Sequence, residues 1–204
     1  MKLPTEQQCQ SYFTAYVVPG NINSHCHKVR EVANFIARTA KKSGVDINIK
    51  LIDCVALLHD LFKIVSLHED DLQPNKFHSY SFSEKEKAMW KKLKEKYPNM
   101  HEGDVAYAVF KEEFPEMALA LKNVSDPQHL NPTTEEMIVK YADLRVFQNN
   151  IISLPERLAY LQERYPSPKW PEYIVKLEKV EQRIKAMIKM NPDTIKQKME
   201  EEKN

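Results

Sequence analysis

Hydrophobic residues recur at the spacing of helical turns along most of the chain. The clearest examples are two stripes, one made by Ile22, Val29, Val32 and Ile36 and the other by Leu51, Val55, Leu58 and Phe62. Residues spaced in this way fall on one face of an α-helix, where they pack against a shared core. Alternation typical of strands is weak throughout, so the sequence predicts an all-α fold, a compact multi-helix bundle.

Helix start and stop signals divide this pattern into separate segments. Asn21 and Ser83 are placed to cap two of the helices, and Glu86 completes a capping box with Ser83. Pro155 suits the first turn of another helix. The predicted helices span about residues 21–42, 47–61, 83–97, 101–113, 116–123, 133–150, 155–164 and 171–189.

Two stretches without helical periodicity interrupt the bundle. Residues 64–82 contain Pro74 and many polar residues, and residues 124–132 contain two prolines, so both are predicted to be irregular. Any selectivity of a binding pocket is expected to lie in residues 64–82 and 100–130. The Asn191-Pro192 pair ends the last long helix, and a charged tail follows.

Three polar residues lie on apolar helix faces, where an unpaired charge is costly. His25 shares its face with Ile22 and Val29, His59 lies on an equally apolar face, and Asp143 has valines one turn away on both sides. A single polar residue in such a place is usually a satisfied core group. Imidazoles and carboxylates from three helices together make a mixed nitrogen and oxygen site for a divalent metal.

Asp60 follows His59 directly, at the end of an apolar helix. Neighbouring residues on an ideal helix point about 100° apart. Both side chains can therefore reach one ion only where the helix ends or is distorted, and the sequence Leu-Leu-His-Asp-Leu-Phe-Lys places them at such a point. The predicted metal ligands are His25, His59, Asp60 and Asp143.

This order of residues resembles the HD superfamily of metal-dependent phosphohydrolases. The resemblance is carried by His25 in Asn-Ser-His-Cys-His-Lys-Val, by His59-Asp60 in Ala-Leu-Leu-His-Asp-Leu-Phe-Lys, and by Asp143 in Lys-Tyr-Ala-Asp-Leu-Arg-Val. It covers about residues 20–150. The resemblance implies an all-α fold, a bound divalent cation and the hydrolysis of phosphate monoesters or diesters, often of nucleotides.

The chain departs from the fuller pattern of this family at two places. Members with two metals carry two more histidines before the last aspartate, and His101 fits the first of them. The second is expected near Val124, whose side chain cannot bind a metal, so we expect one divalent ion. Manganese, iron, cobalt, nickel, magnesium and zinc all remain open. Phe62 also stands where the family commonly has glycine, and it narrows the space there.

Several residues around these ligands are candidates for catalysis. A bound metal lowers the pKa of water and withdraws charge from a phosphoryl group. Lys63 and Arg145 are predicted to bind the substrate phosphate, with solvated surface charges as the competing interpretation. His101 or Glu102 is predicted to move a proton to the leaving group, and a capping role is the alternative for His101. Asp60 and Lys63 complete the predicted catalytic set.

Composition narrows the class of protein. The chain has 204 residues, a formal net charge of +1 and three cysteines without a C-x-x-C pair, which favours a reduced, cytoplasmic protein. Neither a signal sequence nor an apolar run of membrane-spanning length is evident. The lysines between Lys85 and Lys96 alternate with glutamates, so a solvated helix face is favoured over binding to nucleic acid.

These observations lead to a two-part organisation and a ranked set of functions. Residues 1–165 are predicted to form the HD-type phosphohydrolase domain, and residues 166–204 a C-terminal helical extension with a charged tail. The last helix packs on the domain in the first interpretation and forms a homodimer contact in the second. The favoured function is hydrolysis of a small phosphorylated substrate, with a nucleotide foremost. The alternatives are a catalytically weak regulatory protein that binds metal and nucleotide, and a metal-free helical domain.

Overall fold

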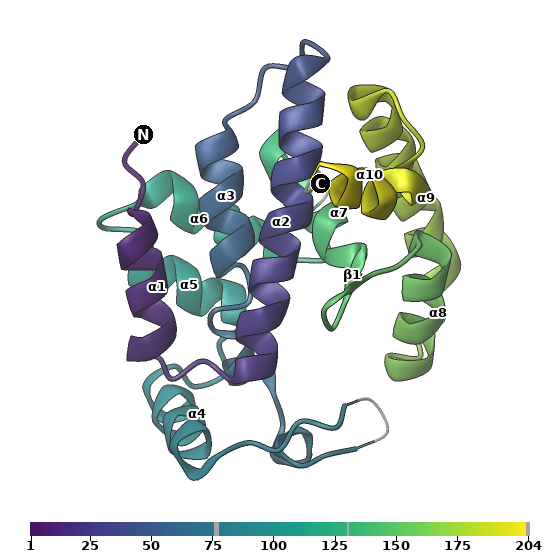
Figure 1. Ribbon diagram of the computed structural model, residues 1–204. Helices are drawn as coiled ribbons and strands as arrows, with labels where there is room; N and C mark the ends of the chain where they lie inside the picture. The colour runs from purple at the N-terminus through teal and green to yellow at the C-terminus, as the bar shows by residue number, and fades with distance from the viewer. Residues whose placement is uncertain (76–77, 130, 203–204) are drawn as a thin grey trace.

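The computed structural model describes residues 1–75, 78–129 and 131–202, and in these ranges the chain is helical, as predicted (Figure 1). The α-helices are α1 (Glu6–Ala15), α2 (Gly20–Lys42), α3 (Ile49–Leu58), α4 (Glu84–Lys96), α5 (Glu102–Phe110), α6 (Pro115–Ser125), α7 (Thr134–Leu144), α8 (Leu154–Arg164), α9 (Trp170–Ile188) and α10 (Ile195–Glu201). Short 3-10 helices are η1 (Lys63–Ser66), η2 (Glu69–Leu72) and η3 (Pro192–Thr194). Strands β1 (Val146–Phe147) and β2 (Asn150–Ile151) form an antiparallel pair.

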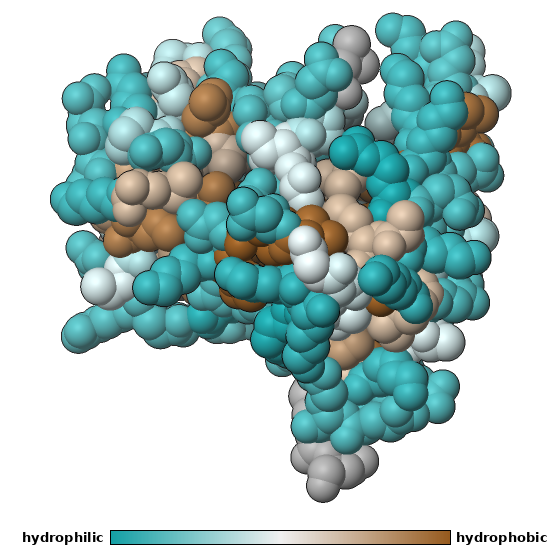
Figure 2. All heavy atoms as spheres, turned by 90° about the horizontal axis from the view of Figure 1, so that it is seen from above, coloured by the Kyte–Doolittle hydropathy of each residue, from teal (hydrophilic) through white to brown (hydrophobic). Residues whose placement is uncertain are grey.

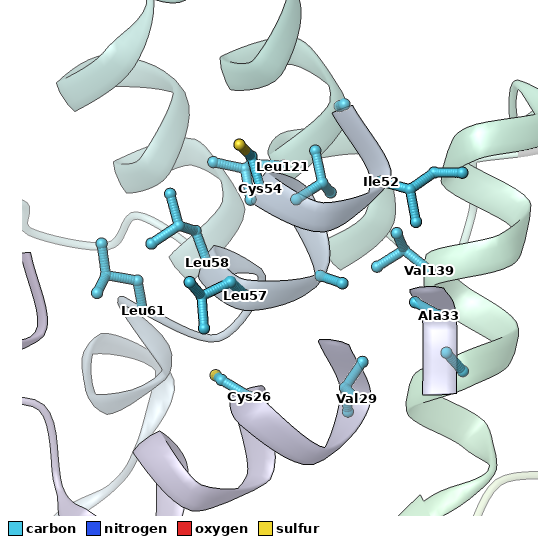
Figure 3. Close-up of a cluster of buried hydrophobic side chains, with 14 of the residues drawn as sticks. Cys26, Val29, Ala33, Ile52, Cys54, Leu57, Leu58, Leu61, Leu121 and Val139 are labelled. Atoms are coloured by element: carbon cyan, nitrogen blue, oxygen red, sulfur yellow. The ribbon is translucent and has the colours of Figure 1, made fainter. Parts of the chain in front are cut away.

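Helix α2 runs through the centre of the molecule and packs against both α3 and α7. In Figure 1, α1, α5 and α6 lie on one side of it and α8, α9 and α10 on the other. Figure 3 shows buried side chains where α2, α3, α6 and α7 meet, and Cys26 and Val29 of α2 face the apolar residues of α3. The two predicted apolar stripes are therefore the faces that form the core, and their burial drives this packing.

The signals at several helix ends act as predicted. Ser83 caps α4 and forms the reciprocal capping box with Glu86, and Pro155 lies in the first turn of α8. The prediction that Asn21 caps α2 is wrong, because the helix begins at Gly20. The Gly20 N–H instead donates a hydrogen bond of 2.9 Å to the hydroxyl of Tyr80, a distant residue that sequence patterning does not connect to this helix end.

Helix α7 is shorter than predicted. It ends at Leu144 rather than near residue 150, and the chain turns into the β1–β2 hairpin, where Gln148 adopts a positive φ of 54°. The Ile152 N–H donates to the Arg145 carbonyl at 2.9 Å, so hairpin bonds replace the continuing helical ladder. Two helices, α1 and α10, have no counterpart in the predicted set, although the capping box of Thr5 at the start of α1 was a readable signal.

The C-terminal helices join the main core. Ile184 and Ile188 of α9 and Ile195 of α10 are buried in the same cluster as the residues of α2 and α3. The division after residue 165 stays a prediction, and the final two residues of the predicted tail lie outside the described residues. Where the chain is described, no helix combines the length and apolar character needed to cross a bilayer. Figure 2 shows hydrophilic side chains over most of one face, with hydrophobic atoms in patches between them.

Candidate metal centre

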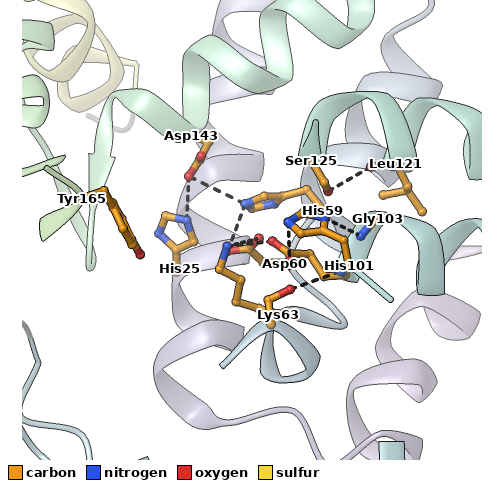
Figure 4. A network of polar contacts seen from close by, with 12 residues as sticks. His25, His59, Asp60, Lys63, His101, Gly103, Leu121, Ser125, Asp143 and Tyr165 are labelled. Atoms are coloured by element: carbon orange, nitrogen blue, oxygen red, sulfur yellow. Dashed lines mark hydrogen bonds and ion pairs between the residues drawn. The ribbon is translucent and has the colours of Figure 1, made fainter. Parts of the chain in front are cut away.

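Three helices bring two imidazoles and a carboxylate together. His25 lies in the N-terminal half of α2, His59 directly follows the last residue of α3, and Asp143 lies in the last turn of α7. Asp143 Oδ1 is 2.9 Å from His25 Nε2 and 3.8 Å from His59 Nε2, as Figure 4 shows. Ligand atoms from all three lie within 4.8 Å of one another. The structure thus gathers three of the four predicted ligands into one compact group.

Asp60 lies beside this group, at the point where α3 gives way to a turn. The helix ends at Leu58, and the Lys63 N–H donates to the Asp60 carbonyl at 2.9 Å as the chain enters η1. The predicted end of the helix at the His59-Asp60 pair is therefore confirmed. Asp60 Oδ2 is 3.7 Å from His59 Nε2 but stands outside the compact group of three, so its role as a ligand stays a prediction.

Backbone carbonyls orient both imidazoles. His59 Nδ1 lies 2.8 Å from the carbonyl oxygen of Ala56, and His25 Nδ1 lies 3.4 Å from that of Gln148 in the β1–β2 turn. An imidazole that donates its Nδ1–H to a carbonyl can offer the lone pair of Nε2 to a bound ion, which is the usual arrangement for metal-binding histidines. Sequence reasoning missed both contacts because backbone carbonyls carry no side-chain signature.

The Nε2 atom of His59 tests whether a metal fits this site. It is buried, and the described residues offer it no hydrogen-bond partner. A buried polar atom without a partner is costly, and a native protein rarely keeps one without a purpose. A divalent ion between His25, His59 and Asp143 would satisfy that atom and match the nitrogen and oxygen donors present. The residues of the site therefore fit a metal.

Opposite charges are concentrated at the site. Burial alone would lower the pKa of His59, but the negative charges of Asp60 and Asp143 raise that pKa well above 6.5. Burial would likewise raise the pKa of Asp143, yet the hydrogen bond to His25 and the charges of both imidazoles hold it well below 3.8. Without a metal, the cluster therefore stabilises a protonated His59 between ionised carboxylates.

Lys63 is linked to the site by two carboxylates. Its Nζ is 2.8 Å from Glu102 Oε1 and 4.0 Å from Asp60 Oδ1, and the charge of Asp60 is the main reason that the pKa of Lys63 is raised. The lysine side chain keeps 38% of its surface exposed, whereas Glu102 is buried. The ammonium group is thus held beside Asp60, on a partly exposed side of the cluster.

His101 serves as the cap of α5. Its Nδ1 accepts a hydrogen bond of 3.4 Å from the Gly103 N–H, and its Nε2 lies 3.1 Å from Glu102 Oε2. Gly103 allows the close approach of α5 to α6, since a Cβ there would lie 2.9 Å from the Cβ of Ser125. In the described parts of the chain, the compact group of candidate ligands does not include His101. Val124, near which the second histidine of two-metal members is expected, is partly buried against the core.

Arg145 lies in the interior, contrary to its prediction as a phosphate-binding residue. Only 2% of its surface is exposed. Its Nε donates to the Ile152 carbonyl at 2.6 Å, and its two terminal nitrogens bond to the Tyr141 hydroxyl at 2.7 Å and to Asp193 at 3.1 Å. The guanidinium therefore ties the end of α7 to the residue after β2 and to η3, which is a structural role.

Comparison with known proteins gives one result. The family model described as HD domain matches residues 24–145, which is more than half of the chain and includes His25, His59, Asp60 and Asp143. No curated protein and no solved structure matches the chain significantly. The matched region ends where α7 ends, so β1, β2 and helices α8 to α10 lie beyond it.

Proposed function

The chain belongs to the HD-domain family, and from this membership we propose that it hydrolyses the phosphate ester of a small substrate with one divalent ion. The resemblance noted in the sequence is thereby confirmed, and the family is one of metal-dependent hydrolases. The observation that carries the proposal is the buried, unpartnered Nε2 of His59 beside Asp143 and His25. We propose these three residues as ligands, with Asp60 as the fourth.

The chemistry divides between the ion and the residues around it. A divalent ion, when bound, withdraws charge from a phosphoryl oxygen and lowers the pKa of a nearby water. The charge of Lys63 on the partly exposed side of the cluster holds the substrate phosphate, while Glu102 fixes the position of that ammonium group. Burial alone would raise the pKa of Asp60, but the charges of Lys63 and His59 lower it, so the carboxylate is ionised. We propose that this carboxylate accepts the proton of the attacking water.

The products follow from the balance of this step. Oxygen from water forms a bond to phosphorus, and the bond between phosphorus and the ester oxygen breaks. The leaving oxygen takes a proton, for which we propose His101, whose Nε2 lies beside Glu102 at the partly exposed rim. The reaction yields an alcohol and a phosphate, with Asp60 protonated until it returns its proton to solvent.

A second function has one observation in its favour. The second histidine of family members with two metals is expected near Val124, and the side chain of Val124 packs against the core. A site with one ion suits a regulatory protein that binds metal and nucleotide but turns substrate over weakly. Such a protein would bind nucleotide in the presence of metal and release no phosphate from any ester tested.

Substitution of Lys63 by methionine tests the proposed hydrolase. Protein stripped with a chelator and reconstituted with manganese, iron, cobalt, nickel, magnesium or zinc is assayed against nucleotides, sugar phosphates and phosphodiesters. We expect phosphate release only with an ion present, and we expect Lys63→Met to lower kcat/KM about tenfold or more because a phosphate contact is lost. Lys50→Met, which removes an exposed lysine of α3, is the matched control. Equal activity of both variants would exclude the phosphate role of Lys63, and metal-independent release would exclude the proposed chemistry.

A further inference from the structure

Three aromatic residues of the C-terminal part of the chain are linked by a ring contact and a hydrogen bond to a backbone carbonyl. This aromatic corner consists of Tyr165, Trp170 and Tyr173, which connect the end of α8 to the start of α9. The rings of Trp170 and Tyr173 are 5.4 Å apart, and Trp170 Nε1 donates to the carbonyl of Tyr165 at 2.8 Å. All three residues follow the region that matches the family, so the family pattern does not account for them.

The aromatic corner is anchored next to Asp143. Its neighbour in sequence, Leu144, packs in a small apolar cluster that includes Trp170 and Tyr173. The negative charge of Asp143 adds to burial in raising the pKa of Tyr173, so the phenol is within electrostatic reach of the site. Figure 4 shows the Tyr165 side chain on the His25 side of the cluster, and Tyr165 directly follows the last residue of α8. The packing of the chain thus brings the aromatic corner to the side of the metal centre that carries His25.

Arg164 holds Tyr165 in place. Its Nε donates to the Tyr165 hydroxyl at 2.8 Å, and its Nη1 donates to the Tyr160 hydroxyl at 2.9 Å. Its Nη2 lies 3.7 Å from Asp71 of η2, which connects the end of α8 to the irregular segment below the site. Tyr165 nevertheless keeps 54% of its surface exposed. A large aromatic side chain that is both restrained and exposed at the rim of a site is a suitable platform for stacking.

We propose that Tyr165 is a specificity-determining residue that stacks on a planar ring of the substrate while the phosphate lies at the metal centre. This inference rests on the proposed hydrolase and narrows its substrate class to phosphate esters that carry an aromatic ring, such as nucleoside monophosphates. Arg164 is a positioning residue, because it acts through Tyr165. Selectivity was expected from residues 64–82 and 100–130, and the structure adds a residue from beyond both.

The size of the effect follows from the physics of stacking. A base that stacks on an aromatic side chain gains affinity of about tenfold or more, largely independent of which base it is. The interaction is present before and during the reaction, so its loss raises KM and leaves kcat nearly unchanged. A phosphate ester without a ring makes no such contact. Tyr165 therefore distinguishes between two substrates that present the same phosphate.

The experiment compares Tyr165→Ala with Tyr165→Phe, which keeps the ring, and with Tyr107→Ala, which removes an exposed tyrosine of α5. Adenosine monophosphate and glycerol phosphate are assayed with the same ion. We expect Tyr165→Ala to raise KM for the nucleotide about tenfold, with kcat and both constants for glycerol phosphate unchanged. Tyr107→Ala should behave like the natural protein. Tyr165→Phe keeps the ring but loses the hydroxyl that Arg164 holds, so it should raise KM for the nucleotide less than Tyr165→Ala does. Equal effects on the two esters, or none on the nucleotide, would overturn the inference.

A binding measurement separates this inference from the proposed function. Calorimetric titration of metal-loaded protein with adenosine monophosphate needs no turnover. If no ester is hydrolysed with any ion, the proposed function fails, and the inference then stands only if Tyr165→Ala weakens nucleotide binding about tenfold while Tyr107→Ala does not. Equal affinity of the natural protein and Tyr165→Ala overturns the inference even where hydrolysis is observed.

Discussion

Replacement of Asp60 by alanine is expected to lower kcat about a thousandfold with the helical fold retained. The carboxylate stands between His59, at 3.7 Å, and Lys63, at 4.0 Å, and the proposal makes it both a metal ligand and the acceptor of the proton from water. Loss of a group that acts in both ways removes several kcal/mol of transition-state stabilisation, on the order of that lost with other essential catalytic groups. Steady-state assays with saturating ion measure the change.

Two further variants separate the effect of the Asp60 charge from the effect of removing any carboxylate. Asp60→Asn keeps the volume and removes only the charge, so it should lose activity nearly as strongly as the alanine variant. Asp46→Ala removes an exposed carboxylate before α3 and should retain full activity. Circular dichroism confirms that each variant is folded. Activity of Asp60→Asn close to that of the natural protein would show that the charge has no part in the reaction.

Metal affinity is expected to rise with pH by about tenfold per unit below the pKa of His59. In the metal-free protein, Asp60 and Asp143 outweigh burial and raise the pKa of His59 well above 6.5, so the imidazole carries a proton near neutral pH. A metal binds the neutral imidazole, so the ion and the proton compete for Nε2. Calorimetric titration between about pH 5.5 and pH 7, in buffers of different ionisation enthalpy, measures both the affinity and the proton released.

The stability of the metal-free protein is expected to change with pH in the direction opposite to metal affinity. A raised pKa in the folded state means that protonated His59 stabilises the metal-free protein below its unfolded pKa, and this stability is lost as pH rises through the folded pKa. The increase in Tm on loading the metal should therefore widen as pH rises. In Asp60→Asn the first of the charges that raise the pKa of His59 is gone, so the pH dependence should shift to lower pH. An affinity that does not change with pH would contradict the proposed role of His59.

Patterns among residues close together in the sequence predicted much of the fold. The capping box of Ser83 and Glu86 involves residues three apart, and the structure places the start of α4 there. The end of α7 was missed because it depends on hydrogen bonds between Arg145 and the hairpin that follows. The start of α2 was missed for a similar reason, since its first N–H is satisfied by Tyr80, sixty positions away. Rules based on neighbouring residues do not describe contacts between distant ones.

The same distinction applies to the site. His25, His59 and Asp143 were identifiable because each interrupts an apolar helix face, and burial of such groups requires a partner. The planar guanidinium of Arg145 suits a phosphate, which is why the sequence predicts that role, but the side chain is buried in the interior. Tyr165 was not singled out, because nothing in its local sequence indicates that α8 brings it to the metal centre. Which side of a helix faces a site depends on the packing of the whole chain.

The metal content of the protein tests the central claim most directly. Natural protein and Asp143→Asn, which keeps the volume of the side chain and removes its charge, are stripped, reconstituted with one divalent ion and freed of unbound metal. Elemental analysis should find one ion per chain in the natural protein and almost none in the variant, because Asp143 is the carboxylate that both imidazoles face. Natural protein without a stoichiometric ion under every metal tested, or equal content in the variant, would contradict the assignment of this cluster as a metal centre.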